Sequence, residues 1–176
     1  THAEAMSSLR AALELMQSFL RIYPALVIEG TEMANQWRKG EFVPLTLDSD
    51  LEICADMSHQ CRVAKIPVIR IGFKQDPQLV DKSLAWPYHP AFGQLVRSRL
   101  WRRAISNTAT DTIECAVNPN DLSDVIGHRA ENREWFNDHC PGVTLSPDQT
   151  VVPGSLRVSG RDLSLTKLLT PGGLHD

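Results

Sequence analysis

The sequence predicts an α/β protein built from two units that follow different orders of secondary structure. Residues 1–104 alternate helix, strand, helix and strand, which is the order found in parallel sheets with helical crossovers. A polar, turn-rich stretch over residues 105–110 then separates this unit from residues 111–176. The second unit is expected to run strand, short helix, helix, strand, strand and helix, so it is a small α+β module.

In the first unit, apolar residues at helical spacing open the chain, and Leu9, Leu13 and Met16 mark the buried face. Thr31 and Asp48 or Thr46 are typical helix caps, and Pro24 is typical of a strand start or edge. The expected elements are a helix over 2–20, a strand over 22–28, a short helix ending near 40, a helix over 48–64, a strand over 67–73, a loop over 74–90 and a helix over 91–104.

In the second unit, alternating apolar residues predict a strand over 112–117, and Asn118-Pro119 precedes a short helix. Gly127 interrupts this helix before a further one, and Asp162 is expected to cap the last helix. The remaining expected elements are helices up to 126 and 139, strands over 143–145 and 155–159, and a helix over 162–169.

Composition excludes several classes of protein. The chain has 176 residues, a net charge of −3 and 42% hydrophobic residues, so it is not a strongly basic nucleic-acid binder. No apolar run reaches the ~18 residues of a membrane span, and no signal-peptide pattern is present, so we expect a cytoplasmic protein without a membrane partner. The cysteines lack metal-ligand spacing and are expected to be buried thiols: Cys54, Cys61, Cys115 and Cys140.

Two long motifs of the first unit carry a resemblance to a known family. Ile22-Tyr-Pro-Ala-Leu-Val-Ile-Glu-Gly-Thr-Glu-Met-Ala and Trp37-Arg-Lys-Gly-Glu-Phe-Val-Pro-Leu-Thr resemble the late part of the radical SAM barrel. The resemblance is to proteins related to the elongator-type catalytic subunit and to oxygen-independent coproporphyrinogen III oxidase, and Pro67-Val-Ile-Arg-Ile-Gly72 extends it. It implies that residues 1–104 form the closing strands and helices of a partial (β/α) barrel.

The same resemblance implies a cofactor site. In that family, strand ends in this part of the barrel line the pocket for S-adenosylmethionine, and the parent protein also binds a [4Fe-4S] cluster. The residues of this chain that the resemblance places at the pocket are Tyr23, Gly30, Thr31, Arg70, Ile71 and Gly72. By residue type alone, Gly30 and Gly72 are equally consistent with ordinary turns.

The cluster-binding C-x-x-x-C-x-x-C motif of that family is absent from this sequence. We therefore expect no metal site, no catalytic residue and no bound cofactor in this chain alone. Two explanations stay open: the chain is the C-terminal part of a longer enzyme, or it descends from one and has lost the chemistry. The helix that begins at the first residues favours the former. The expected partner is then the rest of the barrel, and an open sheet edge also allows an oligomer.

The second unit has a resemblance of its own, carried by Val125-Ile-Gly-His-Arg-Ala-Glu-Asn-Arg-Glu-Trp-Phe136. This segment resembles a KH domain, in which a G-x-x-G loop between two helices clamps the backbone of single-stranded nucleic acid. The resemblance implies a nucleic-acid-binding loop made of Gly127, His128, Arg129 and Ala130, with Arg133 beside it. Ala130 replaces the last glycine. The alternative is a non-enzymatic module that binds RNA or docks a protein.

Overall fold

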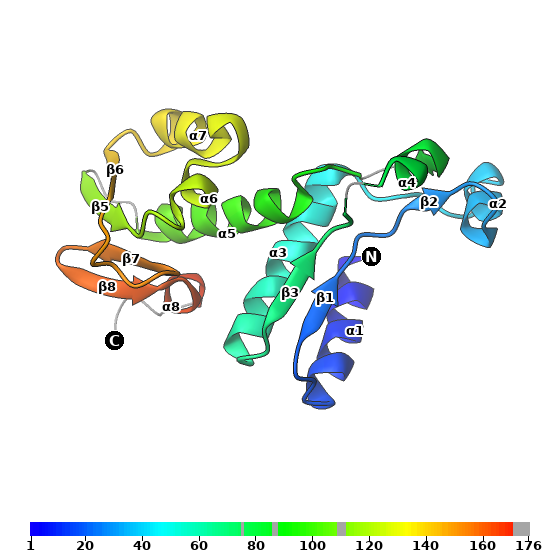
Figure 1. The fold of residues 1–176 in the computed structure, drawn as a ribbon, viewed down its shortest axis with the longest axis horizontal. Helices are drawn as coiled ribbons and strands as arrows, with labels where there is room; N and C mark the ends of the chain where they lie inside the picture. The colour runs from blue at the N-terminus through cyan, green and yellow to red at the C-terminus, as the bar shows by residue number, and fades with distance from the viewer. Residues whose placement is uncertain (75, 86–87, 109–111, 171–176) are drawn as a thin grey trace. The chain divides into compact units, whose positions relative to one another are not determined.

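A computed structural model describes residues 1–74, 76–85, 88–108 and 112–170 of the chain. The fold is mixed α/β, as the sequence predicts, and it divides into two compact units, Thr1–Val96 and Arg97–Asp176 (Figure 1). Among the described residues, no helix is long and apolar enough to cross a membrane.

Two long helices of the first unit pack against each other: α1 (His2–Glu14) and α3 (Leu47–Val63). A hydrogen bond of 2.7 Å between His2 Nε2 and Asp56 Oδ2 joins them. Helix α1 is shorter than the predicted helix over 2–20, because Met16 adopts a positive φ of 46° and ends the helical conformation. For α3, Thr46 is the cap, since its hydroxyl accepts the backbone N–H of Ser49 at 3.2 Å.

The strands of the first unit form two small sheets. Strands β1 (Leu20–Ile22) and β3 (Val68–Ile71) are parallel (Figure 1). Strand β2 (Val27–Ile28) is antiparallel to β4 (Ser83–Ala85). The predicted single strand over 22–28 was therefore wrong. Pro24 lies between β1 and β2, where its missing N–H and fixed φ prevent a continuous ladder.

Two shorter helices complete the first unit. Helix α2 (Glu32–Arg38) follows Thr31, as predicted, whereas α4 (Pro77–Lys82) and strand β4 lie in the segment 74–90 that was predicted to be a loop. The correction has a local cause. The carboxylate of Asp76 accepts the backbone N–H of Gln78 at 2.9 Å, and Pro77 occupies the first helical position, so a helix start is built into the segment.

Helix α5 (Phe92–Thr108) is longer than the predicted helix over 91–104. Residues 105–108 continue this helix instead of forming a linker, because Ile105 is buried and the hydroxyl of Thr108 bonds the carbonyl of Ile105 at 2.8 Å. Residues 109 and 110 of the predicted linker lie outside the described residues. The assignment of separate domains to residues 1–104 and 111–176 stays a prediction.

The second unit contains a four-stranded sheet in the order β6-β5-β7-β8. Strand β5 is parallel to β6 and antiparallel to β7, and β7 is antiparallel to β8. Besides the part of α5 that follows Val96, the described helices of this unit are α6, α7 and α8, with the 3-10 turn η1 between α6 and α7. The bounds are β5 (Ile113–Val117), α6 (Leu122–Ile126), η1 (His128–Ala130), α7 (Glu131–His139), β6 (Val143–Pro147), β7 (Ser155–Val158), β8 (Arg161–Ser164) and α8 (Leu165–Leu169).

The predicted helix over 162–169 was wrong over its first three residues, which belong to strand β8. Ser159 and Gly160 both have positive φ, as in a two-residue hairpin turn, so the chain returns as a strand beside β7. Asp162 is not a helix cap. Its carboxylate accepts two hydrogen bonds from Arg157 across the hairpin, at 2.6 and 3.0 Å, and Ser164 caps α8 instead.

One buried carboxylate in α3 gives the first unit a dependence on pH. Asp50 is 6% exposed, and burial raises its pKa from the ordinary 3.8 to about 6, against a smaller opposing effect of the amino group of Thr1. Folding therefore favours the protonated form. The destabilisation by this side chain is smallest below about pH 4, grows between about pH 4 and pH 6, and stays constant above that range.

We predict that Asp50→Asn raises the free energy of unfolding by about 1–2 kcal/mol at pH 8, because asparagine has a shape similar to that of aspartate but places no charge in the interior. At pH 4 the variant and the parent should differ little. Denaturant unfolding at several pH values measures the difference. A gain that is the same at pH 4 and pH 8 would show that Asp50 does not titrate between them.

Candidate functional site

A pocket opens where the parallel strands β1 and β3 end. Register pairs Arg21 with Arg70 and Ile22 with Ile71, and the backbone N–H of Gly72 bonds the carbonyl of Ile22 at 2.9 Å. Both strands therefore end at the same edge, which is where ligands bind in parallel α/β sheets. The pocket has a volume of about 490 Å³ and is lined by Arg21, Tyr23, Arg70, Phe73, Lys74, Asp76 and Leu79.

One wall of this pocket is aromatic. The rings of Tyr23 and Phe73 lie with their centroids 5.0 Å apart and their planes tilted by 34°. Tyr23 directly follows the end of β1, and Phe73 lies two residues after the end of β3. The side chain of Tyr23 is 44% exposed. An exposed phenol ring at the mouth of a pocket offers a face for a planar ligand group.

The other wall is cationic. Arg21, Arg70 and Lys74 line the pocket, and none of them forms an ion pair within the described part of the chain. Arg21 lies over the ring of Phe19 at 5.9 Å from its centroid. The single carboxylate of the lining, Asp76, caps helix α4. The pocket thus holds three positive charges against one negative charge.

The six residues that the resemblance assigns to a cofactor pocket do not all lie in one place in the structure. Tyr23 and Arg70 line the pocket, while Ile71 lies in the β1–β3 ladder. Gly72 has a positive φ of 76°, and a side-chain carbon there would lie 2.9 Å from Phe92 Cβ, so packing requires glycine at this position.

Gly30 and Thr31 lie elsewhere, at the junction of β2 and α2. The hydroxyl of Thr31 accepts the backbone N–H of Ala34 at 3.2 Å and donates to the carbonyl of Ile28 at 2.7 Å, so it acts as a helix cap. Neither residue lines the pocket. The sequence prediction also missed Arg21, Phe73 and Lys74. Strand alternation was the available signal, because it places Arg21 on the same face as Tyr23.

In the second unit, a buried amide holds the predicted binding loop in place. Asn132, at the start of α7, is fully buried, and its Nδ2 donates to the carbonyls of Ser98 at 2.8 Å and Val125 at 3.1 Å. Its Oδ1 accepts Nε of Arg102 at 2.8 Å. One side chain therefore joins α5, α6 and α7, and its polar atoms are satisfied in the interior.

Gly127 belongs to the same packing. Its φ is 85°, and a side-chain carbon would meet Glu131 Cγ at 2.8 Å and the backbone nitrogen of Asn132 at 2.9 Å. Glycine is therefore needed for the close approach of α6 and α7. This packing accounts for Gly127 without any nucleic-acid contact.

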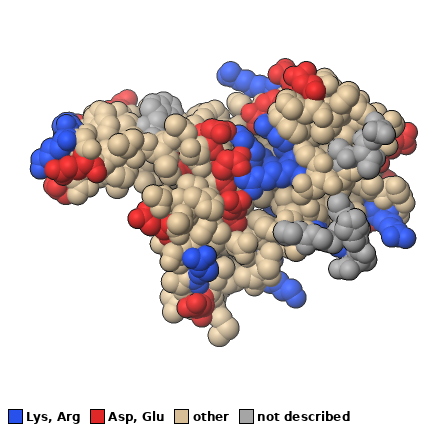
Figure 2. All heavy atoms as spheres, turned by 180° about the vertical axis from the view of Figure 1, so that it is seen from behind, with Lys and Arg blue, Asp and Glu red and all other residues tan. Residues whose placement is uncertain are grey.

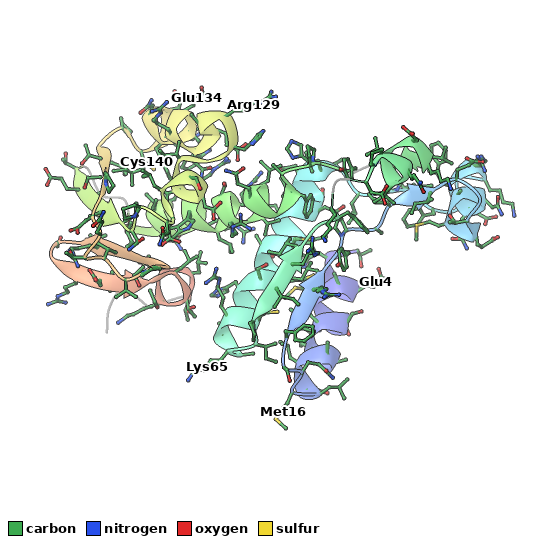
Figure 3. All side chains as sticks on the ribbon, viewed as in Figure 1. Glu4, Met16, Lys65, Arg129, Glu134 and Cys140 are labelled. Atoms are coloured by element: carbon green, nitrogen blue, oxygen red, sulfur yellow. The ribbon has the colours of Figure 1, made fainter. Side chains whose placement is uncertain are left out.

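The rest of the loop turns outward. Arg129 and Ala130 have positive φ values of 52° and 65°, and Arg129 extends from the ribbon into solvent (Figure 3). Arg133 is also exposed, and His128 is half-buried. On the face drawn in Figure 2, Lys and Arg side chains lie next to Asp and Glu side chains, as expected for a chain with a net charge of −3.

The cysteines do not suit an iron–sulfur cluster. Cys54, Cys61 and Cys115 are buried, and burial raises the pKa of each thiol, to about 12 for Cys54 and about 11 for Cys115. Cluster ligands are thiolates. In the part of the chain that the structure describes, no three Cys, His, Asp or Glu side chains gather as metal ligands. These residues therefore do not fit the cluster.

Comparison with known proteins agrees with the motifs of the first unit. The family model of the radical SAM C-terminal domain matches residues 17–102. A tRNA uridine(34) acetyltransferase of Methanocaldococcus infernus is 42% identical over 40 residues, which are 23% of this chain and 8% of that protein. The chain thus spans a small part of that relative's length. No solved structure matches the chain. The first unit is therefore similar to the C-terminal domain of radical SAM proteins.

The loop geometry leads to a paired prediction about stability. Gly127→Ala should destabilise the second unit by about 2–4 kcal/mol, because the added carbon meets backbone and the φ is unfavourable. Ala130→Gly should instead stabilise it by about 1 kcal/mol, because glycine adopts a positive φ without penalty.

Urea unfolding followed by circular dichroism measures both changes. Ser159→Gly, also at a positive φ but in the β7–β8 turn, is the matched control for a gain unrelated to the loop. A lower free energy of unfolding in Ala130→Gly would contradict a left-handed backbone conformation at residue 130.

Proposed function

We propose that this chain is the C-terminal portion of a radical SAM enzyme whose other portion binds the [4Fe-4S] cluster and S-adenosylmethionine. The observation that carries the proposal is the match of residues 17–102 to the radical SAM C-terminal domain. Because the described cysteines do not fit a cluster, the chain by itself would not catalyse the reaction. Its own contribution would be the closing strands of a partial (β/α) barrel and a pocket wall at their ends.

The edges of the β1–β3 sheet support this role. Within the described residues, β1 pairs only with β3, and β3 pairs only with β1, so both outer edges keep unpaired backbone groups. Exposed apolar side chains accompany them, with Phe19 49% and Ile69 51% exposed. Open edges of this kind pair with further strands. The rest of the barrel is the partner we propose for them, and a second copy of the chain would be the substitute when that partner is missing.

A reconstitution experiment tests the proposal. The whole parent protein, purified without oxygen and loaded with iron and sulfide, should show cluster absorbance and convert S-adenosylmethionine to deoxyadenosine. The 176-residue chain alone should do neither. Joining the two parts as separately expressed chains should restore product formation if the strands pair as proposed.

The control is a parent protein in which the cluster-binding cysteines are replaced by alanine, which should lose the cluster. A parent protein that lacks a cluster after loading, or that forms no deoxyadenosine in the presence of reductant, would refute the assignment. A chain that produces deoxyadenosine on its own would refute the division of roles.

The exposed Arg129 and Arg133 favour a second, additional role: that the second unit is a KH-like module that binds single-stranded RNA. The two cations lie on or next to the loop between α6 and α7, which is where a KH domain contacts the nucleic-acid backbone. We propose that the module holds an RNA substrate for the enzyme. RNA binding would then depend on local cations, because the overall charge of the chain is negative.

Titration of labelled single-stranded RNA at two salt concentrations tests this role. The double variant Arg129→Ala and Arg133→Ala should bind about five- to tenfold more weakly and show a smaller salt dependence, because two phosphate contacts are lost. Arg161→Ala, an exposed arginine in β8 of the same unit, should bind like the parent. Equal affinity of the double variant and the parent would exclude the loop as the RNA site.

A further inference from the structure

We infer that the pocket at the ends of β1 and β3 binds a phosphate group that is attached to an aromatic base, as in a nucleotide. The inference concerns the charge and shape of this pocket alone. It holds whether or not the chain is part of a radical SAM enzyme. Nothing in the comparisons assigns this pocket to a ligand.

The lining of the pocket is positively charged. Arg21, Arg70 and Lys74 contribute three cations. Among the lining residues that the structure describes, only Asp76 is acidic, and it already accepts the backbone N–H of Gln78 at 2.9 Å. S-adenosylmethionine carries a sulfonium and an ammonium against one carboxylate, so it is itself a cation near neutral pH. A cationic pocket repels a cationic ligand. The lining therefore favours an anion.

Arg70 lies next to Arg21 in the sheet. The two residues are partners in the parallel register of β3 and β1, and no acidic side chain is paired with either one in the described ranges. Like charges on neighbouring strand positions are destabilising. A cost of this kind is typical of residues retained for binding rather than stability. An incoming dianion would remove the repulsion between the two guanidinium groups.

The position of Arg70 suits a phosphate group. Arg70 is half-buried, so its guanidinium interacts with an anion in a medium less polar than water, and its planar fork matches two phosphate oxygens. Lys74 follows β3 by three residues and lines the same pocket. The ligand's phosphate would thus lie among Arg21, Arg70 and Lys74.

The aromatic wall of the pocket suits a planar base. Tyr23 and Phe73 line the same pocket as the cations, and the ring of Tyr23 is partly exposed. Any planar nucleobase can stack on such rings, because every base has an aromatic face. The pocket volume of about 490 Å³ falls in the range of ordinary small-molecule sites. A phosphate next to a stacked base describes a nucleotide, either free or within single-stranded RNA.

Isothermal titration of the 176-residue chain tests the inference with four probes: adenosine monophosphate, adenosine, inorganic phosphate and a short single-stranded oligouridylate. Adenosine monophosphate should bind more tightly than adenosine and more tightly than phosphate, because both parts of the ligand contribute. Its affinity should fall as salt concentration rises. The oligouridylate and the mononucleotide are compared in the double variant Arg129→Ala and Arg133→Ala, because the loop proposed to bind RNA would otherwise capture the oligouridylate. If the oligouridylate still binds more tightly than the mononucleotide, the phosphate belongs to RNA, and the reverse order identifies a free nucleotide.

Three variants assign the binding to this pocket. Arg70→Gln and Lys74→Gln should each weaken binding of adenosine monophosphate by about tenfold, the usual effect of losing one charge-assisted contact. Arg10→Gln, an exposed arginine on α1 outside the pocket lining, should have no effect. Arg70→Gln should also raise the melting temperature of the ligand-free chain, because it ends the repulsion with Arg21. Added phosphate should then raise the melting temperature of this variant by less than it raises that of the parent chain.

Two results would overturn the inference. The first is equal affinity for adenosine and adenosine monophosphate, which would mean that the phosphate is not recognised. The second is unchanged affinity in both Arg70→Gln and Lys74→Gln, with melting curves that show both variants folded. Because these readouts need neither cluster nor reductant, their failure is independent of the outcome of the reconstitution experiment.

Discussion

The parallel pairing of β1 with β3 is the constraint on which the first unit depends. Two strands of three and four residues bring segments almost fifty positions apart to a common edge, and the pocket exists only because both strands stop there. Gly72 extends the ladder by one bond and then lets the chain turn close to Phe92. A single register shift would move Arg70 away from Arg21 and Tyr23 away from Phe73.

Asn132 has the corresponding place in the second unit. From the first turn of α7, its side-chain amide donates hydrogen bonds to carbonyls of α5 and α6. Its side-chain oxygen accepts a hydrogen bond from Arg102. A buried amide with every bond made is favourable, while the same amide with one partner missing costs more than an apolar side chain would. Gly127 keeps the distance short enough for these bonds. The segment that resembles a nucleic-acid-binding loop is therefore also the joint between three helices.

Much of the fold was predictable from local signals, because caps and apolar periodicity act over a few residues. Thr31, Thr46 and the alternation over 113–117 indicate their elements correctly. The misses arise where a local signal was overridden or discounted. Pro24 divides an apolar run that looks like one strand, Asp76-Pro77 starts a helix inside a polar segment, and Ser159-Gly160 turns the chain into β8 before any helix can begin.

The site was less predictable than the fold, because a pocket combines residues that only tertiary structure brings together. The family resemblance predicts Tyr23 and Arg70 at a cofactor pocket. Both line the cavity at the β1–β3 edge, and their binding of a cofactor stays a prediction. Gly30 and Thr31 share the same motif but serve the turn and cap before α2. Lys74 and Phe73 belong to no motif, and their position beside Arg21 follows only from the register of β1 and β3. Gly127 has a structural cause that the loop pattern does not distinguish from a functional one.

The buried thiols have a practical consequence for following how the chain opens. Cys54 and Cys61 lie in helix α3 of the first unit, and Cys115 lies in strand β5 of the second, all buried and protonated in the folded state. A thiol reagent attacks the thiolate, so each of these side chains is labelled only when its own unit unfolds. The native cysteines thus act as built-in reporters, and peptide mapping after brief labelling would record the opening of each unit separately, without any engineered probe.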